Sequence, residues 1–401
     1  TAFQTTMMLL QEGTIFYTYK SIPEWAKDAL EHGVKSVLLC GWDKGGHDAN
    51  YPCYEPDPRL GSWTDLKDAI DACHQIGMRV FLFVNMQPVD CTTDWYQNEL
   101  SRYRCVGRWG YPRNAVGYGM GTLGGRAGIT HRPLGDINPA FPQVREMLVR
   151  QFRKLAEIGA DGLHIDKVDD PLFDFNEKLD ASPDLASTEG VLITTEQTLA
   201  ACRAVNPDFA VSTECRWDHM LRYSGVAWSW HSHTLGMQDH VPVLKYTFAQ
   251  WLPAIAIDQP YDYQLVNVAI RFGYQLKISP GFFTGSMGDK LWQPLCAYIR
   301  EVERIRAELK DTIYLGEYLH TRGIQVEVPD GVVFSTHRNP RTDKRACVLV
   351  NQSTVVRDLS IFRFHGGDGA VRIYEPFKPV QEAMLPLNLS LPIERLAVVV
   401  E

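Results

Sequence analysis

The sequence has no apolar run that approaches the roughly 20 residues needed to span a bilayer. Its beginning, Thr1-Ala2-Phe3-Gln4, lacks the charged and apolar regions of a signal peptide, so we expect no secretory leader here. A basic field is also missing, because the net charge is -8 and the charged residues, 22% of the total, are interspersed. We therefore expect neither nucleic acid nor a membrane surface as a partner.

Paired cysteine motifs are absent as well. The nine cysteines are scattered at positions 40, 53, 73, 91, 105, 202, 215, 296 and 347, and no two form a CxxC pair. An odd, scattered set is typical of free thiols in a reducing compartment, so we expect a cytoplasmic protein.

What the sequence does contain is an alternation of apolar strand-like runs and amphipathic helical stretches over roughly the first 310 residues. Eight strands are the number that closes a barrel, so the alternation predicts an α/β fold, a (β/α)8 TIM barrel over residues 1–320. The expected strands are Thr14 to Tyr19, Lys35 to Trp42, Met78 to Asn85, Asp161 to Asp166, Phe209 to Glu214, Val226 to Trp230, Leu244 to Phe248 and Tyr274 to Ile278.

Helix-start and helix-stop residues separate these strands. Ser21 with Pro23 predicts a helix that ends at Gly33, and Ser62 predicts another that ends at Gly77. A third covers Phe141 to Gly159, and the last two cover Tyr261 to Phe272 and Leu291 to Leu309.

Beyond the last helix, the pattern changes to short alternating strands. Turns are expected at 329–331, 339–340 and 366–368, where Pro, Gly, Asn and Asp cluster. This predicts a small C-terminal antiparallel β-domain over residues 321–401, packed on the barrel. Two long connections, 86–138 and 169–187, interrupt the barrel pattern, and the aromatic content of the first favours an ordered lid or substrate wall.

Two acidic residues end apolar strands that follow each other along the chain. Asp166 ends Gly162-Leu163-His164-Ile165-Asp166, and Glu214 lies at the tip of the run that begins at Phe209. Catalytic groups of such barrels sit at the carboxyl ends of strands, where the following loops form the open face. Cleavage of a glycosidic bond needs one ionised and one protonated carboxyl, so we predict Asp166 as the nucleophile and Glu214 as the acid/base.

Other residues at the expected strand ends have the chemistry to bind a sugar. Carboxylates, amides and cations bind hydroxyls, and aromatic rings cover the apolar face of a pyranose. The predicted substrate-binding residues are Trp42, Asp43, Asn85, His164, Lys167, Arg216, Trp217, Trp230, His231 and Asp239. His164 lies two residues before Asp166 and is therefore expected on the same side of its strand.

A metal centre is the competing interpretation of some of these residues. His231 and His233 form an HxH pair, and Asp258 could complete a ligand set for a metal-dependent hydrolase. In barrel metallohydrolases that pair typically belongs to the first strand, whereas here it follows the sixth. We therefore expect no metal and no cofactor, and we expect an oligosaccharide or glycoside as the substrate.

The segments 41–61, 74–80, 138–140 and 159–166 together resemble the barrel of retaining glycoside hydrolases. The groups named by this resemblance are the α-galactosidase and α-glucosidase type barrels and the endo-α-N-acetylgalactosaminidases. The resemblance implies a nucleophile at the end of the fourth strand, which matches Asp166. It implies either a Glu after strand five, matching Glu214, or an Asp after strand six, for which Asp239 is nearest. The sequence departs from the amylase pattern at His164, where an Arg usually stands.

These observations predict a glycoside hydrolase, retaining and acting on an α-linked saccharide. Two alternatives remain open from the residues themselves. An inverting glycosidase would use the same carboxylates with water attacking directly, and a non-catalytic carbohydrate-binding barrel would bind a saccharide without turnover. Asp218 and Asp239 are the other candidates for the acid, and Asp218 and Asp258 are equally explained as helix caps.

Overall fold

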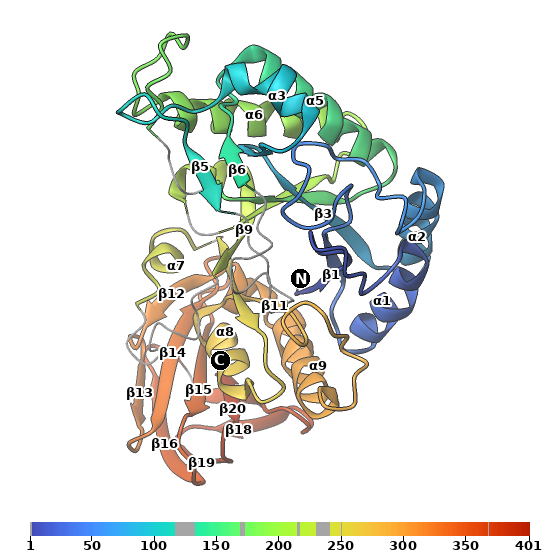
Figure 1. Cartoon of the computed structure of the whole chain (residues 1–401). Helices are drawn as coiled ribbons and strands as arrows, with labels where there is room; N and C mark the ends of the chain where they lie inside the picture. Colours follow the sequence, from blue (N-terminus) through green and yellow to red (C-terminus); the bar gives the residue numbers. More distant parts are fainter. Residues whose placement is uncertain are drawn as a thin grey trace.

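The structure is a computed structural model, which describes residues 2–116, 133–168, 173–214, 217–229, 241–249, 251–367 and 369–401. Within these residues, eight parallel strands close into a barrel, as the sequence predicts (Figure 1). Around the barrel the order is β1-β2-β3-β7-β8-β9-β10-β11, and β11 pairs with β1. The strands are β1 (Phe3–Met7), β2 (Ser36–Cys40), β3 (Arg79–Asn85), β7 (Gly162–Asp166), β8 (Ala210–Glu214), β9 (Ser224–Ser229), β10 (Leu252–Ile257) and β11 (Gln275–Ile278).

The first barrel strand differs from the prediction. It is β1, and the predicted strand at 14–19 is instead a connection, in which Ile15 makes an isolated antiparallel bridge with Leu9. The reason is that β1 carries Gln4, Thr5 and Thr6, which are buried inside the molecule. A run with three polar residues has no apolar signature, although barrel closure buries it.

The seventh strand also differs. Residues 244–248, predicted as a strand, belong to the short helix α7 (Val243–Thr247) and its end, and β10 is the seventh strand. Pro253 lies in β10, paired with Ala227 of β9. Because proline lacks a donor, sequence reasoning argues against a central strand there.

Six helices of the described chain surround the barrel, and five of them match helices predicted from the sequence, whereas α6 was not predicted (Figure 1). The Ser62 side chain accepts the N–H of Asp65, whose carboxylate accepts the N–H of Ser62, so a capping box starts α2. The six are α1 (Ile22–Glu31), α2 (Trp63–Gln75), α5 (Pro142–Glu157), α6 (Ala186–Arg203), α8 (Tyr263–Phe272) and α9 (Gln293–Glu308).

The long connection between β3 and β7 is ordered in its described part. It contains β4 (Pro88–Asp90), α3 (Asp94–Asn98), β5 (Asn114–Val116) and β6 (Pro133–Asp136), and the strands form a small sheet in the order β4-β6-β5. Asp90 accepts the N–H of Asn50 at 2.9 Å, which ties this sheet to the loop after β2. The described part of this connection is structured, as the sequence predicts, and its residues 117–132 lie outside the described residues.

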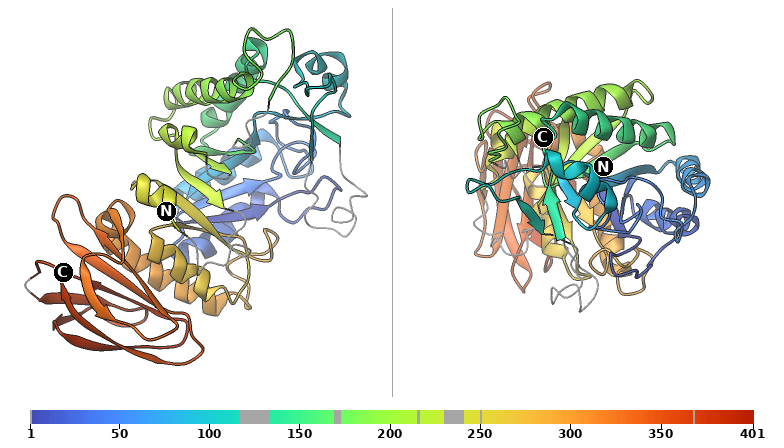
Figure 2. Two further views of the ribbon diagram at one scale, coloured as in Figure 1. Left: turned by 90° about the vertical axis from the view of Figure 1, so that its left-hand side faces the viewer. Right: turned by 45° about the horizontal axis from the view of Figure 1, so that its top comes forward.

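The C-terminal strands form an antiparallel β-domain against α8 (Figure 2). One sheet has the order β12-β14-β15-β20-β17-β18 and the other the order β13-β16-β19. In β15 alternate residues face opposite ways: Val348 joins the barrel core, while Leu349 joins the core between the two sheets. The strands are β12 (Glu317–His320), β13 (Ile324–Glu327), β14 (Val332–Arg338), β15 (Arg345–Asn351), β16 (Arg357–Phe364), β17 (Ala370–Tyr374), β18 (Gln381–Met384), β19 (Leu387–Leu391) and β20 (Leu396–Val400).

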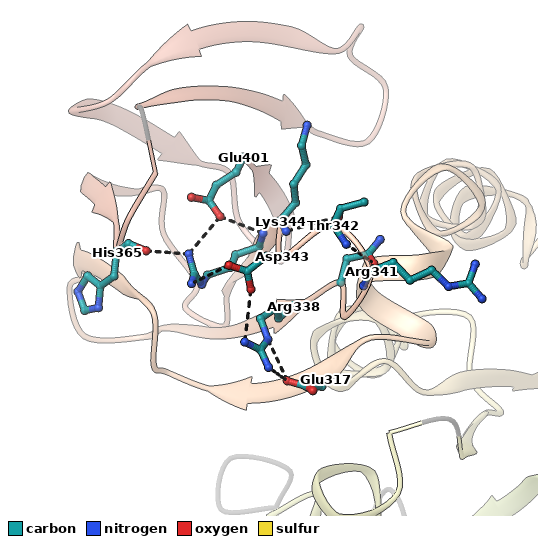
Figure 3. A network of polar contacts seen from close by, with 10 residues as sticks. Glu317, Arg338, Arg341, Thr342, Asp343, Lys344, His365 and Glu401 are labelled. Atoms are coloured by element: carbon teal, nitrogen blue, oxygen red, sulfur yellow. Dashed lines mark hydrogen bonds and ion pairs between the residues drawn. The ribbon is translucent and has the colours of Figure 1, made fainter.

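A network of ion pairs and hydrogen bonds lies on the larger of these sheets (Figure 3). Arg338 lies 2.6 Å from Glu317 and 3.3 Å from Asp343, and Arg345 donates to the carbonyl of His365 at 2.7 Å. The groups around Arg338 are partly exposed, so each pair adds little to stability. None of the helices among the described residues has the length and apolar character that crossing a membrane requires.

Candidate active site

Two neighbouring barrel strands bring Asp166 and Glu214 together. Ile165 of β7 pairs in register with Thr213 of β8, so the next residue of each strand emerges at the same end of the barrel. There the carboxyl group of Glu214 forms a hydrogen bond with that of Asp166. Asp166 is 4% exposed, and Glu214 is half-buried. Asp166 and Glu214 are thus the last residues of β7 and β8.

The surroundings drive the pKa values of the two carboxyls apart. Burial raises the pKa of Glu214 well above its usual range, and the negative charge of Asp166 raises it further. Burial alone would raise the pKa of Asp166 too, but the Lys167 ammonium and the hydrogen bond with Glu214 lower it well below its usual value. The pair thus holds one ionised and one protonated carboxyl at neutral pH.

Lys167 touches both carboxyls. Its backbone N–H donates to Glu214 Oε2 at 3.2 Å, and its Nζ donates to Asp166 Oδ2 at 2.6 Å. Its φ of 53° lies in the left-handed region, which is unusual for a residue with a side chain. The same ammonium lies 3.6 Å from Oδ1 of Asp48, which comes from the loop after β2.

His164 lies in β7 beneath the carboxyl pair. Its Nδ1 and the hydroxyl of Ser212 on β8 are 2.9 Å apart, and its ring stacks on Trp228 of β9. Burial lowers the pKa of His164 to about 3, so the imidazole is neutral. Its Nε2 is buried and has no hydrogen-bond partner among the described residues.

Two further predicted residues are buried polar groups without hydrogen-bond partners in the part of the chain that the structure describes. Asn85 ends β3 directly beside Asp166 in register, and neither its side-chain oxygen nor its nitrogen is hydrogen-bonded to a described residue. Asp43 follows Trp42, and no other described residue donates a hydrogen bond to its carboxylate. Buried polar atoms without partners are rare, so such atoms in a site are where a ligand's hydroxyls can bind.

The two described tryptophans among the predicted sugar contacts differ in burial. Trp42 is completely buried and donates its indole N–H to the carbonyl of Phe83 at 2.9 Å. This ring belongs to the core, so the predicted stacking of Trp42 on a sugar was wrong. Trp217 is half-buried, and its ring lies 5.2 Å from that of His219.

Four predicted site residues, Arg216, Trp230, His231 and Asp239, lie outside the described residues, as does His233. Among the alternative acids, Asp218 is exposed and accepts the N–H of His219 at 3.0 Å. Asp258 is buried at the end of β10 and does not cap α8, whose N-cap residue is Asp262. Among the residues that the structure covers, no three His, Cys, Asp or Glu side chains are grouped to hold a metal ion.

Sequence reasoning missed Lys277, which reaches the barrel interior from β11. Its Nζ lies 4.5 Å from the centre of the Trp228 ring and 4.2 Å from that of Phe283. Burial lowers the pKa of Lys277 to about 8, although Asp258 acts in the opposite direction. The available signal was a lysine in the middle of an apolar strand, which is rarely buried without a function.

The fold was compared with known proteins. No protein-family model matches the chain, and no curated protein sequence matches it. An α-amylase from Geobacillus thermoleovorans, solved with acarbose, is similar, with a TM-score of 0.67, 12% identity, and coverage of 100% of this chain and 97% of that one. A Nostoc punctiforme debranching enzyme is similar too, with a TM-score of 0.63, 12% identity, and coverage of 99% of this chain and 97% of that one.

A cycloisomaltooligosaccharide glucanotransferase from Paenibacillus sp., in complex with cycloisomaltoheptaose, gives a TM-score of 0.71 at 9% identity, covering 100% of this chain and 84% of that one. At such low identities these likenesses establish the fold, a (β/α)8 barrel with a C-terminal β-domain. The similar structures include an α-amylase barrel, although this chain has His164 where the amylase pattern usually has an Arg.

Proposed function

We propose that the protein is a retaining glycoside hydrolase that cleaves an α-linked saccharide, with Asp166 as the nucleophile and Glu214 as the acid/base. The observation that carries the proposal is the hydrogen-bonded carboxyl pair, one member ionised and the other protonated, at the ends of β7 and β8. Glycosidic cleavage needs this combination.

The closeness of the pair supports retention over inversion. Retaining enzymes place their carboxyls about 5 to 5.5 Å apart, whereas inverting enzymes need about 6.5 to 9.5 Å for a water between them. Two carboxyls that share a hydrogen bond are closer to the retaining spacing than to the inverting one. The substrate's leaving oxygen would replace Asp166 as the partner of the Glu214 proton.

In the first step, Asp166 attacks the anomeric carbon while the proton of Glu214 moves to the departing oxygen. The glycosidic bond breaks, and a glycosyl ester of Asp166 forms. In the second step, Glu214, now ionised, takes a proton from water. The hydroxide attacks the anomeric carbon, the sugar leaves, and Glu214 is again protonated. The chemistry needs no cofactor.

Several buried groups suit a sugar in this site. The side chains of Asn85 and Asp43 and the Nε2 of His164 have no hydrogen-bond partner among the described residues, so they offer hydrogen bonds to hydroxyls. Lys167 contacts both carboxyls, and Arg216, Trp217, Trp230, His231 and Asp239 remain predicted contacts. The solved neighbours include an α-amylase with acarbose, which supports an α-linked oligosaccharide here.

Three finer points belong to the same proposal. Residues 1–320 would form the catalytic unit and 321–401 a stabilising domain. The eight described cysteines are free, which supports the cytoplasm as the location. Kinship with α-galactosidase and endo-α-N-acetylgalactosaminidase barrels would explain the position of Asp166.

The test is a panel of aryl α- and β-glycosides and α-linked oligosaccharides, assayed with the wild type, Asp166→Asn and Glu214→Gln. We expect turnover of an α-glycoside and a loss of at least about a hundredfold in each variant. Proton NMR of the first product should show the anomeric configuration of the substrate. The opposite configuration would favour inversion, and binding without turnover would favour a carbohydrate-binding barrel.

Exposed residues of the same types provide matched controls. Asp208→Asn and Glu196→Gln make the same chemical changes at the surface and should keep full activity. Activity that survives both active-site substitutions would overturn the proposal.

A further inference from the structure

We propose that Asp48 and Lys167 form a positioning pair, in which Asp48 holds the Lys167 ammonium against Asp166 and so fixes the orientation of the nucleophilic carboxylate. This inference rests on the proposed function, because it concerns how the nucleophile is held. The two residues are far apart in the sequence, and only the barrel brings them together.

The ammonium of Lys167 lies between two carboxylates. Its Nζ is 2.6 Å from Asp166 Oδ2 and 3.6 Å from Asp48 Oδ1. Asp48 is completely buried, whereas the side chain of Lys167 keeps 29% of its exposure. The lysine therefore enters from the open side, and the buried carboxylate determines where its charge rests.

Asp48 is held in place by its own loop. Its φ of 57° is left-handed, and its N–H donates to the Tyr51 hydroxyl at 3.0 Å. The preceding residue, His47, donates its N–H to the carbonyl of Leu9 at 2.9 Å. A Cβ at Gly46 would lie 2.8 Å from the same carbonyl, so only glycine lets the loop approach so closely. The loop is therefore a rigid support.

Lys167 is held by its backbone. The left-handed conformation allows the N–H to reach Glu214 while the side chain turns to Asp166. Strained residues of this kind persist where the surroundings fix them, and they cluster at functional sites. Another described cation near the pair, Lys277, lies against the rings of Trp228 and Phe283.

The charged and titratable groups around Asp166 come from several elements, and the experiment must account for them. They are His164 and Lys167 on or next to β7, Glu214 on β8, Cys40 on β2, His47, Asp48 and Tyr54 in the following loop, and Lys277 on β11. A substitution of Lys167 removes its side-chain charge and keeps the backbone N–H that donates to Glu214.

The first experiment compares the pH dependence of kcat/KM in the wild type, Lys167→Met and Lys167→Arg. Methionine keeps most of the stem and removes the charge, so the acid limb set by Asp166 should move up by about 1 to 3 pH units. Arginine should restore that limb, which a purely structural role would not predict. Lys67→Met, which breaks the exposed Lys67–Asp71 pair, is the matched control and should change nothing.

The second experiment tests Asp48 through a double-mutant cycle. Asp48→Asn should lower kcat by on the order of tenfold or more, because the ammonium loses its support. The Asp48→Asn, Lys167→Met double variant should be no worse than Lys167→Met, since Asp48 acts through Lys167. Additive losses would overturn the role of Asp48.

A direct measurement separates this inference from the proposed function. In protein labelled with ¹³C at the aspartate carboxyls, the signal of Asp166 is assigned by its loss in Asp166→Asn. It should titrate at higher pH in Lys167→Met than in the wild type, whether or not any glycoside is cleaved. An unchanged titration would overturn the positioning pair even in an active enzyme, whereas a shift in an inactive protein would overturn only the proposed function.

Discussion

The imidazole of His164 stacks on the indole of Trp228, with ring centroids 3.6 Å apart and an angle of 22° between the planes. This contact and the burial around it keep His164 neutral, since they give the charged imidazolium no water. The residue two positions before the proposed nucleophile is therefore an uncharged hydrogen-bonding group.

We predict that His164 does not titrate between pH 5 and 8, because burial lowers its pKa to about 3. Its ¹⁵N chemical shifts should remain those of one neutral tautomer across this range. Protonation of His164 near pH 6 would contradict the buried environment.

Glu214→Gln should stabilise the fold above about pH 5. The folded pKa of Glu214 is raised, by burial first and by Asp166 second, so its contribution to stability is full below the unfolded pKa and is lost as the pH rises. Glutamine has no charged form to bury. The free energy of unfolding of the variant should therefore exceed that of the wild type by an amount that grows by up to about 1 kcal/mol per pH unit. Urea unfolding at pH 5, 6 and 8 measures it, and a constant difference would argue against the shift.

Asp174 should be essential for the order of the described insertion. Its Oδ1 accepts a hydrogen bond from the N–H of Val106 at 2.8 Å, and its Oδ2 accepts one from Nδ2 of Asn138 at 2.7 Å. Asp174→Ala removes both acceptors from a buried site, at a cost of about 1 to 3 kcal/mol. Hydrogen exchange around residues 104–107 should rise while that of β7 stays slow. Glu177→Ala, at an exposed neighbouring position, should leave both unchanged.

Gly162→Ala should destabilise the strand that carries Asp166. A Cβ there would lie 2.3 Å from Phe81 Cε1 and 2.4 Å from the carbonyl of Ala210, and the latter is backbone that cannot move aside. Overpacking of this kind costs about 1 to 3 kcal/mol. Gly225→Ala in β9 meets nothing within 4 Å and serves as the control. Equal melting temperatures for the two variants would contradict the packing argument.

The sequence by itself determined the architecture and the place of the two carboxyls. Strand and helix periodicity, the Ser62 cap and the apolar run into Asp166 are local signals, because hydrophobic spacing and capping act within a few residues. Most of the barrel and the Asp166–Glu214 neighbourhood follow from them, since parallel strands end on one face.

Only the tertiary structure decided the rest. Closure of the barrel buries β1 although this strand carries three polar residues. It also includes Pro253 in β10, although proline is disfavoured in a central strand. It places the Trp42 ring in the core, and it brings Asp48 to Lys167 from a separate loop. These outcomes depend on contacts between distant segments, whose energies no local pattern records.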